Sequence, residues 1–316
     1  MFSLRQILLS PFALIYGIIT GIRNFCYDHD IFKSTAFDTP IISIGNLSTG
    51  GTGKTPMVEY LIQSLGHKYS IAVLSRGYRR KTSGFLWVEK TESPSKVGDE
   101  PLQLKTKFNE VIVAVSEDRV DGVQKICKKY PQINLILLDD AFQHRKIKPK
   151  VTLLLTTYNK PFVTDYLLPA GNLRESRLGM QRSDAIIVTK CPQKFEQIPI
   201  RHKPIFYAIS SYQNPTVNQT VFGFSGLANN DIFKAHLKES YSLVGFKSYT
   251  DHHHFTQKDI DTLINLAQNS VLICTEKDWI KVQHLTIKHP IEKVGISHQI
   301  QEEQKFNHWL LKQIES

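Results

Sequence analysis

The sequence contains little cysteine and no cysteine pattern that would organise a fold. Its four cysteines are far apart in the 316 residues, and no two of them have the Cys-x-x-Cys spacing; they are Cys26, Cys127, Cys191 and Cys274. This argues against a zinc ribbon and against a small secreted domain held together by disulfides. It fits a protein exposed to a reducing compartment.

Internal repeats and low-complexity tracts are also absent from the sequence. Charged residues make up 22% and hydrophobic residues 41%, which argues against disorder and against a protein with many membrane spans. The formal charge of +10 favours contact with polyanions, and nucleic acids, anionic lipid headgroups and nucleotide phosphates all qualify. No DNA-binding or RNA-binding signature accompanies the charge, so a nucleic-acid-binding module is the least supported of these alternatives.

One segment near the amino terminus has no charged residue. It runs from Ile7 to Ile22 between Arg5 and Arg23, and one proline and two glycines interrupt it. A membrane-spanning helix needs about 20 apolar residues, and no small-residue cleavage site of a signal peptide follows. We therefore expect residues 1–30 to form a helix or helical hairpin at a membrane interface. An ordinary buried helix, a full span and a signal sequence remain alternatives.

A glycine-rich loop lies between a predicted strand and a predicted helix. Thr39–Gly45 is β-branched and apolar, and Met57–Leu65 has apolar residues at helical spacing. The loop between them contains Ser48, Thr49, Gly50, Gly51, Thr52, Gly53, Lys54 and Thr55. Its amide groups can surround a phosphate of ATP at the helix N-terminus, with Lys54 reaching the β- and γ-phosphate oxygens and Thr55 binding Mg²⁺. The strict motif has glycine at position 48, so a glycine-rich turn with an incidental Lys-Thr pair is the alternative.

Acidic residues follow a second buried strand. Leu135–Leu138 is fully apolar and leads directly into Asp139 and Asp140. In P-loop enzymes a carboxylate at such a strand end holds Mg²⁺, and we expect one of these two to do so. The alternative is a strand-end turn or a helix N-cap.

Further apolar runs predict the fold class. They lie at 71–74, 111–115, 151–155 and 185–188, with room for helices between them. This spacing predicts an α/β fold with a P-loop NTPase-like core, in which helices flank a mostly parallel sheet. Polar residues cluster just after these runs, where α/β sheets build ligand sites. The segment Val97–Pro101 is expected to be a loop.

Six motifs together resemble the tetraacyldisaccharide 4'-kinase family. They are GNLSTGGTGKTP at 45–56, LSRGYRR at 74–80, GDEP at 98–101, LDDAFQHR at 138–145, LLPAGNLRE at 167–175 and TEKD at 275–278. The resemblance implies transfer of the ATP γ-phosphate, with Mg²⁺, to the 4'-hydroxyl of the tetraacyldisaccharide 1-phosphate precursor of lipid A. It also implies a peripheral or monotopic protein on the cytoplasmic face of a bacterial inner membrane, with no nucleic acid and no obligate protein partner.

The resemblance also implies roles for individual residues. Asp99 corresponds to the general base for the sugar hydroxyl, and His252, in the DHHHF segment at 251–255, supports it. Lys54 is catalytic and binds ATP. The implied nucleotide ligands further include Gln143 and His144, the metal ligands Thr55, Glu100, Asp139 and Asp140, and the substrate ligands Arg76, Arg174 and Glu175. From the residues alone, solvated loop histidines, a surface Arg-Glu ion pair and a solvated Arg76 remain alternatives.

A function of another class also fits part of the sequence. A membrane-targeted P-loop switch ATPase would use the loop and the amino-terminal segment but would leave GDEP and DHHHF without a role. For the domains, we predict a kinase core at 1–215 and a smaller α/β domain at 216–316 that closes over the active site. The boundary is placed at the turn-rich segment 210–215. Strands are expected at 221–225 and 271–275, with a helix at 259–267.

Overall fold

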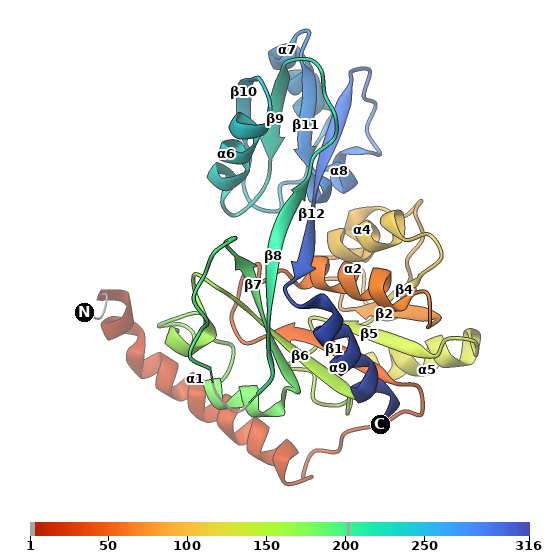
Figure 1. Ribbon diagram of the computed structural model, residues 1–316, viewed down its shortest axis with the longest axis vertical. Coiled ribbons are helices and arrows are strands. Elements are labelled where there is room, and N and C mark those ends of the chain that lie inside the picture. Colours follow the sequence, from red (N-terminus) through yellow and green to blue (C-terminus); the bar gives the residue numbers. More distant parts are fainter. Residues whose placement is uncertain (1–3, 201–202) are drawn as a thin grey trace.

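A single mixed sheet runs through the protein. The computed structural model describes residues 4–200 and 203–316, and within them 12 strands join into this sheet (Figure 1). Across the sheet the order is β10 (Leu243–Ser248), β9 (Val221–Ser225), β11 (Val271–Thr275), β12 (Ile291–Ile300), β8 (Ile205–Gln213), β7 (Ala185–Cys191), β6 (Val151–Thr157), β1 (Ile41–Asn46), β5 (Leu135–Asp139), β2 (Ile71–Ser75), β4 (Ile112–Val115) and β3 (Leu86–Trp87). The β12–β8 and β3–β4 pairs are antiparallel, and the other pairs are parallel. The predicted mostly parallel α/β fold is confirmed.

Helices cover both faces of the sheet. They are α1 (Leu4–Asp28), α2 (Lys54–Leu65), α3 (Pro94–Val97), α4 (Asp99–Lys107), α5 (Arg119–Lys129), α6 (Asn230–Ser240), α7 (Gln257–Ala267), α8 (Glu276–Val282) and α9 (Glu303–Glu315), with 3-10 turns at Phe162–Thr164 and Arg177–Arg182. Alternate residues of β5 enter different cores: Leu137 packs in the core under α2, α4 and α9, whereas Leu138 packs under α5. Burial of both faces explains why these strands are continuous apolar runs.

The upper part of the molecule in Figure 1 is joined to the lower part by β8 and β12. The first half of β12 pairs with β11, and residues 295–300 pair with β8. Helix α9 then packs on α2, where the Tyr60 hydroxyl donates to Asn307 Oδ1 at 2.9 Å. The end of the chain thus returns to the core formed by the first half. The domain division at residue 215 stays a prediction, but the turn-rich interpretation of 210–215 is wrong in part, because residues 210–213 belong to β8.

Helix α1 is a single unbroken helix that lies along the outside of the molecule (Figure 1). Pro11 removes the amide that would bond to the Ile7 carbonyl, and the Ser10 hydroxyl donates to that carbonyl at 2.9 Å instead. Of the two forms expected for this segment, a helix or a helical hairpin, the described residues form the single helix, and residues 1–3 lie outside the described residues. By length and composition alone, Gln6–Asp28 could cross a membrane.

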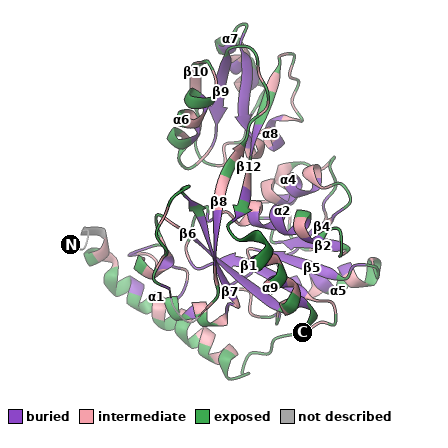
Figure 2. Ribbon diagram, in the orientation of Figure 1, coloured by how far each residue is buried: buried purple, intermediate pink, exposed green. Residues whose placement is uncertain are grey.

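One side of α1 is apolar and exposed to solvent, and much of the helix ribbon is coloured as exposed in Figure 2. The exposed fraction lies between 53% and 66% for Ile7, Leu8, Phe12, Leu14, Ile15, Ile18, Ile19, Ile22 and Phe25. The opposite side contacts the protein: Ala13 is buried, and a side chain at Gly17 would collide with Leu167 Cδ1 at 2.8 Å. An apolar stripe of this length is uncommon on a surface in water and indicates a binding face.

Candidate active site

The glycine-rich loop connects β1 to the N-terminus of α2, as predicted. Gly53 precedes the helix in a left-handed conformation, with φ of 81°, and a Cβ there would lie 2.5 Å from His298 Nε2. Both the backbone angle and the close approach require glycine. Gly50 and Gly51 are exposed to solvent, so the positive end of α2 is open to an anion.

The carbonyl side of this loop is held by Thr189 and Lys190, which belong to the polar residues predicted at strand ends, and by His298, which the sequence did not indicate. Lys190 Nζ donates to the Gly51 carbonyl at 2.7 Å, and Thr189 Oγ1 donates to the Thr52 carbonyl at 2.8 Å. His298 Nε2 lies 3.1 Å from the Gly53 carbonyl, and burial lowers the pKa of His298 to about 4, so the ring is neutral and donates this bond. These contacts come from β7 and β12 and fix the loop.

The motif at 167–175 packs alongside the same loop. The Thr49 amide donates to the Asn172 carbonyl at 2.8 Å, and the Arg174 amide donates to the Leu47 carbonyl at 2.8 Å. The guanidinium of Arg174 therefore lies next to the loop, where its Nη1 is 3.0 Å from Asp140 Oδ1. This placement favours the predicted role of Arg174 in contacting an anionic substrate over an isolated surface ion pair.

Asp140 is an ionised carboxylate between two cations. Lys54 Nζ lies 3.6 Å from Asp140 Oδ1, the oxygen that Arg174 also contacts, and 3.4 Å from Asn46 Oδ1. Burial alone raises the pKa of Asp140, but the charges of Lys54 and Arg174 outweigh it and lower this pKa below its ordinary value. Lys54 is thus held at the mouth of the loop, where it can reach a bound phosphate.

Asp139 is almost completely buried, with 1% of its surface exposed. Its Oδ2 accepts a hydrogen bond from Ser75 Oγ at 3.1 Å, whereas its Oδ1 has no hydrogen-bond partner among the described residues. Burial, together with the nearby charges of Glu100 and Asp140, raises the pKa of Asp139 to about 7. A buried carboxylate oxygen without a partner is costly unless a cation or a proton satisfies it.

The chemistry of the predicted metal ligands fits Mg²⁺. Glu100 and Asp140 lie close enough to Asp139 for their charges to raise its pKa, and together with the predicted Thr55 hydroxyl they offer the carboxylate and hydroxyl oxygens that Mg²⁺ prefers as ligands. Within residues 4–200 and 203–316, no three acidic, histidine or cysteine side chains converge tightly enough to hold a metal alone. Mg²⁺ in phosphoryl-transfer enzymes is held by one or two carboxylates together with phosphate oxygens and waters, so such a cluster is not needed.

Asp99 and His252 meet although they are far apart in the sequence. His252 Nδ1 lies 3.3 Å from Asp99 Oδ2, and Lys281 Nζ lies 3.8 Å from the same oxygen. Burial raises the pKa of Asp99, but the hydrogen bond with His252 and the charges of Lys281 and Lys277 outweigh it and lower this pKa. Asp99 is therefore an ionised acceptor at neutral pH.

The expected loop at Val97–Pro101 is instead the start of a helix. Asp99 and Glu100 form the first turn of α4, and Gly98 precedes it with φ of 96°. A Cβ at Gly98 would lie 3.2 Å from the Cα of Gly77, so GDEP packs directly against the segment after β2. The positive end of the α4 dipole stabilises the negative charges of Asp99 and Glu100. This preference of acidic residues for a helix start was overlooked when the segment was predicted to be a loop.

Glu175 does not have the exposure that a substrate ligand requires. It is 2% exposed, and its oxygens accept hydrogen bonds from Arg182 Nη2 at 2.9 Å, Gln143 Nε2 at 3.0 Å and Asn24 Nδ2 at 2.6 Å. We therefore revise its predicted role from direct contact to positioning. Gln143 Nε2 likewise donates to Glu175 and to the Asn46 carbonyl, the latter at 2.9 Å. Direct contact of Gln143 with the nucleotide stays a prediction.

Helix α1 contacts this same network. Tyr16 donates to the Arg174 carbonyl at 2.7 Å, and Arg23 Nη2 donates to the Gln143 carbonyl at 2.6 Å. With the Asn24 bond to Glu175, three polar side chains of α1 join the residues directly behind the loop. The helix is therefore joined to the site by specific bonds as well as by apolar packing.

Two arginines, Arg76 and Arg119, lie near Asp139 and Asp140. Arg76 is exposed, whereas Arg119 at the start of α5 is 3% exposed and its Nε has no partner within the described chain. Burial and then the charge of Arg76 lower the pKa of Arg119, while Asp139 and Asp140 raise it. Arg119 is not among the residues predicted from the sequence, although it follows the end of β4 at the sheet edge where the other predicted ligands lie. Burial lowers the pKa of His144 to about 4, so this predicted nucleotide ligand is neutral.

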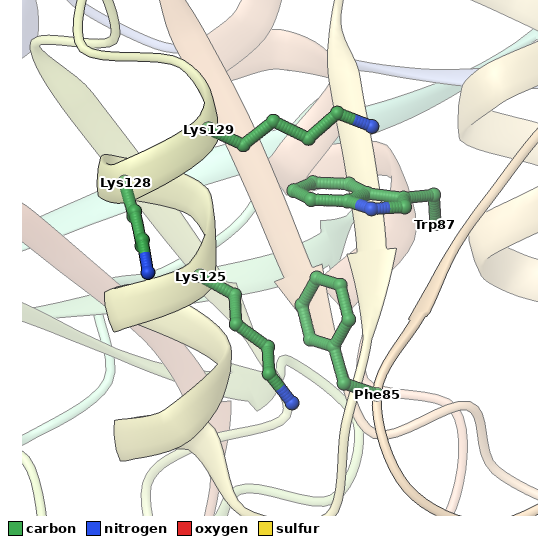
Figure 3. Close-up of a pocket in the computed structure, with 5 residues that line it drawn as sticks. All are labelled: Phe85, Trp87, Lys125, Lys128 and Lys129. Atoms are coloured by element: carbon green, nitrogen blue, oxygen red, sulfur yellow. The ribbon is translucent and has the colours of Figure 1, made fainter.

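Two surface hollows lie outside these contacts. One of about 560 Å³ lies between the end of α1 and the start of α5 and includes Phe32 and Lys146. The other, of about 480 Å³, is shown in Figure 3 and is lined by Phe85, Trp87, Lys125, Lys128 and Lys129. The ammonium groups of Lys125 and Lys129 lie over the Phe85 and Trp87 rings, 5.1 and 4.6 Å from their centroids. None of the predicted site residues lines this second hollow.

Comparisons with known proteins point to one family. The family model described as tetraacyldisaccharide-1-P 4'-kinase matches residues 5–315. The tetraacyldisaccharide 4'-kinase of Flavobacterium psychrophilum is 43% identical and covers 87% of this chain and 86% of its own. That of Flavobacterium johnsoniae is 39% identical, with 94% of each chain covered. A crystal structure of LpxK from Aquifex aeolicus, described as a complex with ATP, has a TM-score of 0.84 at 31% identity and covers 98% of this chain and 99% of its own.

Proposed function

Because this chain belongs to the tetraacyldisaccharide-1-P 4'-kinase family, we propose that it phosphorylates the 4'-hydroxyl of tetraacyldisaccharide 1-phosphate, a late step of lipid A biosynthesis. ATP is the phosphate donor and Mg²⁺ the metal. The observation that carries the proposal is that a phosphate loop and an acceptor-activating carboxylate share one site. Glu100, whose charge acts on Asp139 beside the loop, is the immediate neighbour of Asp99, which pairs with His252.

The residues of the site divide into two groups around the transferred phosphate. On the donor side, the loop amides and Lys54 bind the ATP phosphates, with His144 and Gln143 close by. Thr55, Asp139, Asp140 and Glu100 would hold Mg²⁺, which neutralises charge on the phosphates when bound. Phosphoryl transfer depends mainly on positioning and charge neutralisation, so these groups need only hold the donor in line with the acceptor.

On the acceptor side, Asp99 would receive the proton of the sugar hydroxyl. The lowered pKa of Asp99 makes it a weak base. Because the transition state of phosphoryl transfer is loose, the carboxylate is needed mainly to orient the hydroxyl. His252 would hold Asp99 in place through Nδ1. Arg174 and Arg76 would contact anionic groups of the lipid or of ATP, and Glu175 would fix Gln143 and α1.

The acylated substrate requires the site to work at a membrane surface. The exposed apolar side of α1 supports insertion of this helix into the interface, while its other side bonds to the loop network through Tyr16, Arg23 and Asn24. We therefore propose a peripheral or monotopic protein on the cytoplasmic face of the inner membrane, where ATP is present. The proposal involves no nucleic acid and no obligate protein partner.

The alternative of a switch ATPase is not favoured, since it leaves Asp99 and His252 without a task. The deciding experiment is transfer of ³²P from [γ-³²P]ATP to tetraacyldisaccharide 1-phosphate in detergent micelles. We expect label on the lipid at the 4' position. Turnover of ATP without labelled lipid would support the switch ATPase and contradict the kinase.

A further inference from the structure

The TEKD motif at 275–278 has no role in the proposed function, yet it forms the start of α8. The Thr275 hydroxyl caps this helix and also donates to Asp278 Oδ2 at 2.7 Å. Asp278 has no exposed surface and accepts a second bond from the Gly226 amide at 3.0 Å. A fully buried carboxylate with these partners fixes the position of the helix start.

Two lysines on one side of α8 face the Asp99–His252 pair. Lys277 and Lys281 are four residues apart and therefore lie on the same side of the helix. Lys277 Nζ is 3.3 Å from His252 Nε2, and Lys281 Nζ is 3.8 Å from Asp99 Oδ2 and 3.2 Å from Asp278 Oδ1. Lys277 thus lies beside His252, and Lys281 lies beside Asp99.

The contact of Lys277 constrains which nitrogen of His252 carries the proton. An ammonium group has three donors and no acceptor, so Nε2 must act as an acceptor in this contact. The ring proton then lies on Nδ1, where it donates to Asp99 Oδ2 at 3.3 Å. The competing arrangement, with Nε2–H donating to Asp251, is not available because that oxygen is 3.8 Å away.

We propose that Lys277 is a positioning residue that holds His252 in the Nδ1–H tautomer and so keeps Asp99 oriented toward the acceptor hydroxyl. This inference rests on the proposed kinase function. With the proton on Nε2 instead, the lone pair of Nδ1 would face the Asp99 carboxylate, and the ring would turn away. Control of a histidine tautomer through the bond made by its other nitrogen is a general device of catalytic sites.

Helix α8 is also tied to the helix that carries Asp99. Lys107 of α4 lies 2.7 Å from Glu59 Oε2 and 3.3 Å from Glu276 Oε2, and Gln103 Nε2 donates to both carboxylates. The backbone conformation of His252 is fixed as well, since its φ of 58° is left-handed and its amide donates to the Gly226 carbonyl at 3.3 Å. The segments that carry Lys277, His252 and Asp99 are therefore held in place by hydrogen bonds and ion pairs.

The test measures the tautomer directly, by ¹⁵N NMR of the full chain in detergent micelles with labelled histidine. The His252 signal is assigned with His252→Gln. In the wild type we expect a protonated Nδ1 and an acceptor-type Nε2. Lys277→Met, which keeps the chain length but cannot donate, should shift His252 toward the Nε2–H tautomer. Lys277→Arg, which retains donors and has no acceptor, should restore the wild-type pattern. Lys258→Met, on the exposed side of α7, is the control.

Steady-state kinetics provide the second readout. Lys277→Met should lower kcat for lipid phosphorylation about tenfold or more, the usual effect of losing a charge-assisted hydrogen bond, with KM for ATP unchanged and partial recovery in Lys277→Arg. Where the methionine variant does not fold, Lys277→Ala gives the same comparison. A protonated Nε2 in the wild type, or an unchanged His252 signal in the variants without a donor, would overturn the proposal. A wild type that labels no lipid refutes the kinase function, while the NMR result still decides the tautomer.

Discussion

The buried Asp139 carboxylate should make the metal-free protein less stable as the pH rises. Its Oδ1 has no partner within the described chain, and its pKa in the folded protein is about 7, compared with an ordinary 3.8. The folded state thus binds a proton that the unfolded state has already lost. A raised folded pKa gives stability that is complete below the unfolded pKa and is lost as the pH rises through the folded one. The loss falls between about pH 4 and pH 7.

Replacing Asp139 by asparagine removes this loss while keeping the shape of the side chain. The difference between the two pKa values corresponds to roughly 4 kcal/mol of unfolding free energy at full ionisation. Relaxation and water entry reduce this figure, so we expect Asp139→Asn to gain about 1–3 kcal/mol above neutral pH. For a chain of this length, whose unfolding entropy is about 0.7 kcal/mol/K, that is a rise in Tm of about 2–5 °C. The same variant should lose Mg²⁺-dependent activity.

The assay is thermal unfolding with EDTA, at about pH 5 and about pH 8, for the wild type and Asp139→Asn. We expect the Tm gap between the two proteins to widen toward the higher pH. Asp140→Asn is the matched control, because Lys54 and Arg174 hold the Asp140 pKa low and its stabilisation should be present at neutral pH and lost in acid. A gap that is the same at both pH values, or an asparagine variant that is less stable at pH 8, would refute the assignment of Asp139 as an unsatisfied carboxylate.

Three further substitutions test other parts of the structure. Gly53→Ala would place a methyl group 2.5 Å from the His298 Nε2 atom of β12, so ATP affinity measured by calorimetry should fall at least about tenfold. Gly84 has a similar φ but no atom within 4 Å of the added Cβ, so Gly84→Ala should leave ATP affinity unchanged. Ile18→Asp on the exposed side of α1 should reduce flotation with liposomes and leave ATP affinity unchanged, and undiminished flotation would disprove the membrane role of this surface. Lys107→Met removes the cation beside the buried Glu59 but leaves the hydrogen bond from Gln103 Nε2, and it should cost about 2–3 kcal/mol in urea unfolding, less if Glu59→Gln is added.

Elements buried on both faces were predictable from the sequence. Strands β1, β2, β5, β9 and β11 are fully buried, so their apolar runs reveal them directly. The phosphate loop was predictable because its residues must be adjacent in the chain to surround a phosphate. The mixed burial of β10 and β12 hides a regular pattern, and the pairing of β12 with both β11 and β8 depends on distant partners.

The site residues also divide into those that the sequence predicts and those that depend on contacts between distant segments. The Asp99–His252 pair could be named only from the family resemblance, since 153 positions separate the two residues. Lys190 and His298, which hold the loop carbonyls, belong to no motif quoted from the sequence and act through contacts between distant strands. Glu175 was selected by its motif, but the partners that saturate its carboxylate come from α1, from the segment after β5 and from the 3-10 turn at Arg177–Arg182. Burial of that kind cannot be read from residue type.

The most direct test of the kinase assignment separates phosphate transfer from ATP binding in one variant. Asp99→Ala should abolish ³²P transfer to tetraacyldisaccharide 1-phosphate and leave ATP affinity nearly unchanged, because the proposed role of Asp99, which pairs with His252, is on the acceptor side. Asp231→Ala, which also removes a first-turn helix aspartate but at an exposed position in α6, should transfer phosphate normally. Retained transfer by Asp99→Ala, or a large loss of its ATP affinity, would contradict the role of Asp99 in activating the lipid hydroxyl.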